Sequence, residues 1–238
     1  MDYKHYYLRT IKKEANGIKL VLGGTGLGKT HGMREAVKDY LNSDREEKKK
    51  LIYITNRHNL ITEQKREFEK VNFKCCYLKG NREIILDILK TNQIEQLIDN
   101  LESNDFFKYD EAYKSRGKRK AKLTKLINGI DSKVQLLKEG KQKNNTLLKT
   151  IDKDLGLECD ELFRIFKTQL ILVGRNDEKL HNTLKENEFV WKLFPYVAFE
   201  NNPDANILLT TIHKVLMGFF DGKKDIKIAS IENKIVFL

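Results

Sequence analysis

Short apolar runs alternate with polar, amphipathic stretches over the first 80 residues. The runs at 18–22, 51–54 and 73–78 are rich in aliphatic and β-branched side chains, so each predicts a buried β-strand. Between them, residues 31–41 and 55–68 have the apolar spacing of helices that bury one face. Strands that alternate with helices are typical of a parallel sheet flanked by helices, so the pattern predicts an α/β fold.

This alternation stops near residue 80. The stretch 81–195 is polar and predominantly helical in its spacing. An apolar heptad runs from Leu123 to Leu137 and resumes from Leu148 to Leu155. Gly140 lies at a bend between the two halves, which indicates a helical hairpin or short coiled coil. An ordinary pair of packed amphipathic helices fits the same spacing.

Strand-like runs return at 207–209 and 235–238, with a weaker one at 227–229. We therefore predict one discontinuous α/β domain, residues 1–80 and 196–238, interrupted by a large, mainly helical insertion at 81–195.

Composition narrows the class of protein. The 238 residues are long enough to bury a substantial core, and no run of 18 apolar residues predicts a membrane span. The N-terminus lacks the apolar region of a secretory signal. Three cysteines do not make a disulfide framework, and neighbours on a strand, Cys75 and Cys76, point to opposite faces and cannot share a metal. These features predict a cytoplasmic protein without a membrane partner.

Positive charge is concentrated in one part of the insertion. The chain has a formal net charge of +11, and residues 111–150 carry 12 Lys or Arg against three acids, a net +9. Such a cluster suits a polyanion bound without sequence specificity, although a solvated helical face has the same composition. The candidate nucleic-acid contacts at its start are Arg116, Lys118, Arg119 and Lys120.

A glycine-rich segment carries the clearest chemistry. Residues 23–30 read G-G-T-G-L-G-K-T, which fits the phosphate-loop (Walker A) pattern G-x-x-x-x-G-K-[ST], with a predicted strand before it and a helix after it. Backbone N–H groups and the helix N-terminus would hold phosphate oxygens, Lys29 would bind the β- and γ-phosphates, and Thr30 would ligate Mg²⁺. Lys29 and Thr30 are therefore the candidate catalytic residues. The predicted ATP-binding residues are Gly23, Gly24, Thr25, Gly26, Leu27, Gly28, Lys29, Thr30 and His31.

Three segments in order resemble the motifs of superfamily 2 (DEAD/DEAH-like) helicases. Residues 23–30 resemble motif I, 52–57 with Leu60 and Gln64 resemble motif Ia, and 205–216 resemble motif Ic. The resemblance implies a RecA-like, P-loop NTPase domain of an ATP-dependent helicase or translocase, a hydrolase that binds DNA or RNA. The nucleic-acid contacts that it implies are Thr55, Asn56, Arg57, Thr210, Thr211 and His213.

The same resemblance identifies 235–238 as the strand that leads to motif II. The metal-binding aspartate would then follow Leu238, with a second RecA-like domain C-terminal to it. The Asp-Glu pairs at 110, 160 and 177 lie in polar or helical surroundings and do not replace that motif. We therefore expect this fragment, truncated just before motif II, to bind ATP and Mg²⁺ with little hydrolysis. Alternatives are a non-motor P-loop nucleotide-binding regulatory module and a small-molecule kinase.

Overall fold

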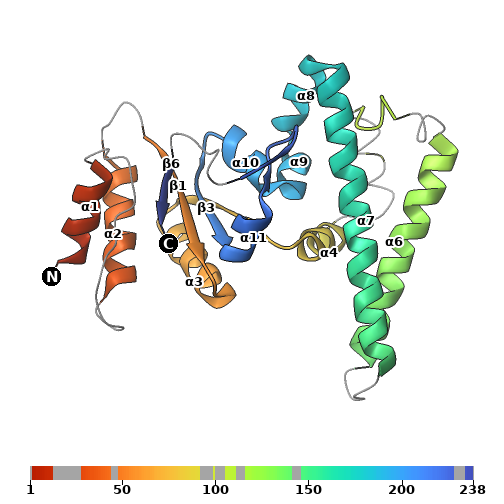
Figure 1. Cartoon of the computed structure of the whole chain (residues 1–238), viewed down its shortest axis with the longest axis horizontal. Coiled ribbons are helices and arrows are strands. Elements are labelled where there is room, and N and C mark those ends of the chain that lie inside the picture. Colours follow the sequence, from red (N-terminus) through yellow and green to blue (C-terminus); the bar gives the residue numbers. More distant parts are fainter. Residues whose placement is uncertain are drawn as a thin grey trace.

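A four-stranded parallel sheet has helices on both of its faces (Figure 1). A further group of helices, the helical part, lies to one side of this sheet. The computed structural model describes residues 2–12, 28–43, 48–91, 99, 105–110, 116–140, 146–227 and 234–237. No helix in these ranges is long and apolar enough to cross a membrane. The strands, in their order across the sheet, are β2 (Lys74–Tyr77), β3 (Ala205–Thr211), β1 (Lys50–Thr55) and β6 (Lys234–Phe237).

The sheet joins segments that are far apart in the chain. Leu51 of β1 pairs with Ile207 of β3 on one side and with Ile235 of β6 on the other, and all neighbouring strands are parallel. The predicted α/β class and four predicted strands are thereby confirmed. The predicted strand at 18–22 lies outside the described residues. Of the weak run at 227–229, Lys227 is in no strand, and residues 228–229 lie outside the described part. A short hairpin of β4 (Phe219–Phe220) and β5 (Asp225–Ile226) precedes them.

Both faces of the sheet are buried, which is why its strands read as continuous apolar runs. Leu51, Ile207 and Leu209 face a cluster with α1 (Tyr3–Lys12), α2 (Lys29–Leu41) and α3 (His58–Glu69). Ile52, Ile54 and Leu208 face the opposite cluster, which contains Tyr196 and Phe199 of α10 (Pro195–Asn201) and Phe219.

The adjacent cysteines of β2 illustrate this alternation. Cys75 packs against the first cluster and Cys76 against the second, as predicted for neighbours on a strand. Burial raises the pKa of the Cys75 thiol to about 12 and that of Cys76 to about 11. Both thiols therefore stay protonated near neutral pH.

The helical part has its own hydrophobic core. This hydrophobic cluster contains Phe107, Phe166 and Leu170. It also contains Val197 and Phe220, which follow the predicted insertion in the sequence. The long helices α6 (Arg116–Glu139) and α7 (Thr146–Asn176) pack together as the hairpin that the heptad predicts (Figure 1). The domain limits themselves stay a prediction. The helices of this part are α4 (Asn81–Thr91), α6 (Arg116–Glu139), α7 (Thr146–Asn176), α8 (Glu178–Lys185) and α9 (Glu188–Leu193).

Candidate functional site

The end of the phosphate-loop motif forms the start of helix α2. Gly28 is the N-cap residue, with φ 74° and ψ 14°, and its carbonyl accepts the first helical hydrogen bond from the Gly32 N–H at 2.8 Å. This left-handed backbone favours glycine, because an L side chain there is strained whatever space surrounds it. The remaining predicted loop residues lie outside the described part of the chain: Gly23, Gly24, Thr25, Gly26 and Leu27.

The first turn of α2 suits an anion. It contains no acidic residue, and its N-cap, Gly28, makes no side-chain capping hydrogen bond within the described part of the chain, so no described acid opposes the positive end of the helix dipole there. Gly28, Thr30 and His31 are exposed and Lys29 is half-buried. The exposed Thr30 hydroxyl is a hard oxygen ligand of the kind that Mg²⁺ accepts. Among the described residues no cluster of three His, Cys, Asp or Glu could hold a metal ion.

Helix α1 packs directly on this first turn. A Cβ atom added to Gly32 would lie 2.6 Å from Tyr3 Cβ and 2.8 Å from the Lys4 backbone nitrogen, so only glycine permits the contact. An ion pair of 2.9 Å between Lys4 and Asp39 joins the same two helices. Gly32 was not among the sequence-predicted site residues, and its place one turn after Lys29 is the signal that could have found it.

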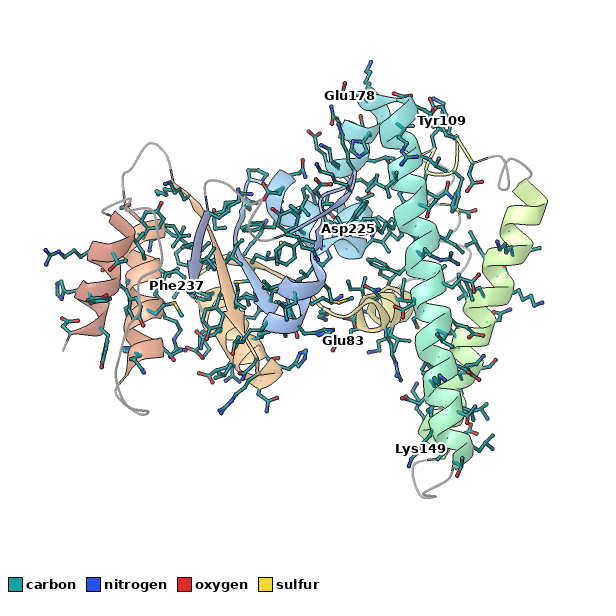
Figure 2. All side chains as sticks on the ribbon, in the orientation of Figure 1. Glu83, Tyr109, Lys149, Glu178, Asp225 and Phe237 are labelled. Atoms are coloured by element: carbon teal, nitrogen blue, oxygen red, sulfur yellow. The ribbon has the colours of Figure 1, made fainter. Side chains whose placement is uncertain are left out.

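A groove of about 780 Å³ opens where three parallel strands end; we name it the strand-end groove. It gathers residues from 56–58, 77–83 and 211–214, at or just after the ends of β1, β2 and β3. Ten of its thirteen lining residues have polar side chains, and Glu83 of α4, labelled in Figure 2, is the acidic one. The lining residues are Asn56, His58, Thr62, Lys65, Tyr77, Leu78, Lys79, Gly80, Glu83, Thr211, Ile212, His213 and Lys214.

The strand-end groove brings together three of the predicted nucleic-acid residues. Asn56, Thr211 and His213 all line it, because Thr55 and Thr211 are paired neighbours at the ends of β1 and β3. Asn56 and His213 are exposed. The Thr211 hydroxyl accepts a hydrogen bond from the Lys214 N–H at 3.3 Å and keeps its own proton to donate.

Three other predicted residues beside this groove have different positions. Thr55 is half-buried and its hydroxyl accepts from the Arg57 N–H at 3.3 Å. Arg57 is exposed at the N-cap of α3 and does not line the groove. Thr210 is fully buried on β3, on the same face of the strand as Leu208. Its hydroxyl has no hydrogen-bond partner among the described residues, and its side chain does not line the groove.

Sequence analysis missed several residues that shape the groove. His58 Nδ1 lies 2.7 Å from the Tyr77 hydroxyl, which joins α3 to β2. Lys79 pairs with Asp87 at 2.5 Å, and Lys214 donates to Asn81 Oδ1 at 3.5 Å. Burial lowers the pKa of Lys214, against the opposing effects of Asp160 and Glu83. Their shared signal is position just after a predicted strand, since carboxyl ends of parallel strands meet at one edge of a sheet.

The basic candidates at the start of α6 lie elsewhere. Helix α6 packs on α7, and in Figure 1 it stands on the far side of α7 from the sheet. Lys120 is exposed there; the side chains of Arg116, Lys118 and Arg119 lie outside the described part. The structure therefore does not bring these residues to the strand-end groove.

No protein-family model matches this chain, and no curated protein is significantly similar to it.

Proposed function

We propose that this chain is the ATP-binding, RecA-like domain of a nucleic-acid-dependent ATPase or helicase of superfamily 2. One observation carries the proposal: residues from three distant segments converge in the strand-end groove at the carboxyl edge of a parallel sheet. Open α/β sheets bind their ligands at this edge. The four-stranded parallel sheet is compatible with a RecA-like fold.

ATP would bind at residues 23–30, with its phosphates at the N-terminus of α2. Lys29 would neutralise the β- and γ-phosphates, and the Thr30 hydroxyl would ligate Mg²⁺. The uncapped, acid-free first turn of α2 supports this assignment, because it leaves backbone donors for phosphate oxygens.

Nucleic acid would cross the strand-end groove through its sugar-phosphate backbone. Asn56 and Thr211 supply neutral donors, and Lys65 and Lys79 supply positive charge along the same lining. Contacts of this kind position a strand without reading its sequence. The partner that we propose is therefore DNA or RNA bound without sequence specificity.

We expect the 238-residue chain to bind ATP with little hydrolysis. None of its Asp-Glu pairs stands at the end of a described strand: Asp160 and Glu161 lie within α7, and Asp177 is the N-cap of α8. Asp110 follows a turn and accepts a hydrogen bond from Gln169. No such pair is placed to hold the metal and orient water beside α2.

The test is binding of a fluorescent ATP analogue with Mg²⁺, measured by anisotropy. Lys29→Ala should weaken binding about ten- to a hundredfold, the range expected for a lost charged hydrogen bond. Lys38→Ala is the matched control, because Lys38 lies on the same helix and pairs with Glu35 at 2.7 Å. Unchanged affinity in Lys29→Ala would contradict the site. ATP binding without any affinity for nucleic acid would instead support the regulatory module.

A further inference from the structure

A second, smaller cleft of about 350 Å³ adjoins the strand-end groove. Three residues, Lys65, Tyr77 and Lys79, line both hollows. The cleft runs beside β2, which is the outermost strand on this side of the described sheet. A chain-like ligand that leaves the groove past Tyr77 therefore meets this cleft next.

The far wall of the cleft comes from the helical part. Ile84 and Ile88 of α4 and Trp191 of α9 line it, together with Pro195. The Trp191 ring is half-buried, and its Nε1–H donates to the Lys185 carbonyl at 2.5 Å. That hydrogen bond restrains the indole ring, which contributes an aromatic group to the wall of the cleft.

Charge around the cleft is positive at its rim. Lys65, Lys79 and Lys192 line it, and its carboxylate, Asp87, is paired with Lys79. The thiols of Cys75 and Cys76 are neutral, because burial raises the pKa of each. An apolar, aromatic interior with a cationic rim suits a flat heterocycle that hangs from an anionic backbone.

We propose that this Trp191 cleft is a subsite for one unpaired base of the strand held in the strand-end groove. The proposal rests on the proposed function, because it needs a nucleic-acid strand in the groove. It makes the ligand a strand with accessible bases, since a duplex keeps its bases stacked inside. It also gives the helical part a wall of the binding site.

Trp191 is the chain's single tryptophan, so its fluorescence reports on this cleft alone. The full chain is titrated with an oligodeoxythymidine and with a strand of equal length made of abasic sugar phosphates. We expect both to bind, as seen by anisotropy of labelled copies, and only the base-bearing strand to quench Trp191. Equal affinities for the two strands with unchanged Trp191 fluorescence would contradict the base subsite in the cleft, and would still support binding of the strand in the groove. Failure of both strands to bind would overturn the nucleic-acid function itself.

Variants separate stacking from a structural role. Trp191→Ala should weaken binding of the base-bearing strand about 5- to 150-fold, the range expected for the loss of one base–aromatic stack. The affinity for the abasic strand should not change. Trp191→Phe keeps a ring and should retain most of the affinity. Leu157→Ala, at a side chain 59% exposed on α7, is the control and should bind as the unaltered chain does. An equal loss for both strands in Trp191→Ala would show a structural effect and contradict the proposal.

Discussion

Two regions of this molecule combine positive charge with a surface open to solvent, and they differ in shape and in how their cations are held. In the strand-end groove, Lys79 is fixed by Asp87 and Lys214 by Asn81, within a concave lining. On the α6–α7 hairpin the lysines stand on a protruding surface, and Lys149 lies near its free end (Figure 2). The groove can orient a ligand, whereas the hairpin offers charge without converging contacts.

The hairpin also carries its own counter-charges. Lys133 of α6 pairs with Glu158 of α7 at 2.7 Å, and Asp152 and Asp160 of α7 bond to Arg82 and Asn81 of α4. Asp152 and Asp160 therefore face α4, whereas Glu158 faces α6 and neutralises one of its lysines. Net charge in a sequence segment therefore overstates the field at any one site.

The largest expected contrast is in nucleic-acid binding. Asn56→Ala combined with His213→Ala should weaken binding of a single strand about ten- to a hundredfold, because two polar contacts in the groove are lost. Lys125→Ala with Lys138→Ala, both exposed on α6, should reduce the slope of log affinity against log salt by about 0.7 per lysine. Titrations at several salt concentrations measure both effects. A larger loss for the hairpin pair at every salt concentration would make the hairpin the main contact.

A medium effect is expected where the helical part meets the β4–β5 turn. His181 of α8 is buried and donates from Nε2 to the Gly222 carbonyl at 3.1 Å, while Nδ1 has no partner. Burial lowers the pKa of His181, and Lys185 and Lys223 add to this, against the Gly222 hydrogen bond and Asp221.

Because the folded state resists protonation, the unfolded state binds more protons below about pH 6.5. The free energy of unfolding should therefore fall as pH drops through that region, by at most about 1.4 kcal/mol per pH unit for this group. Denaturant unfolding at pH 7.5 and 5.5 measures the change. His181→Gln should flatten it, and His213→Ala, which removes an exposed histidine, should not. Equal pH dependence in His181→Gln would assign the effect to other groups.

The smallest effect concerns α3, the helix whose N-terminus borders the groove. Gln64 is fully buried on the same helix as the buried Ile61 and Phe68, and neither polar atom of its amide has a hydrogen-bond partner among the residues that the structure describes. Gln64→Met keeps the length of the side chain and removes the unpaired amide, so it should raise the free energy of unfolding by about 1 kcal/mol. Gln135→Met, exposed on α6, should change it by less than about 0.5 kcal/mol. A loss of stability in Gln64→Met would reveal a partner for the amide.

Periodicity was enough to predict the parallel sheet and the helical hairpin. Leu51 and Ile207 lie in apolar runs that only a buried strand explains, and Ile130 keeps a helical phase with Leu123. That Tyr77 and Thr211 line the same groove could not be predicted, because it depends on β3 lying between β1 and β2. The place of Trp191 in the cleft beside β2 could not be predicted either, because it depends on where α9 docks.

The order of strands also dictates how this chain must fold. Leu51 and Ile207 are direct neighbours in the sheet, yet the entire helical part lies between them in the chain. Closing so long a loop costs entropy before any pairing compensates for it, while the α6–α7 hairpin forms from contacts close in sequence. We expect the hairpin to fold early and to shorten the effective loop, so that β1 and β3 pair late. Folding of the helical part would then set the rate at which the sheet forms.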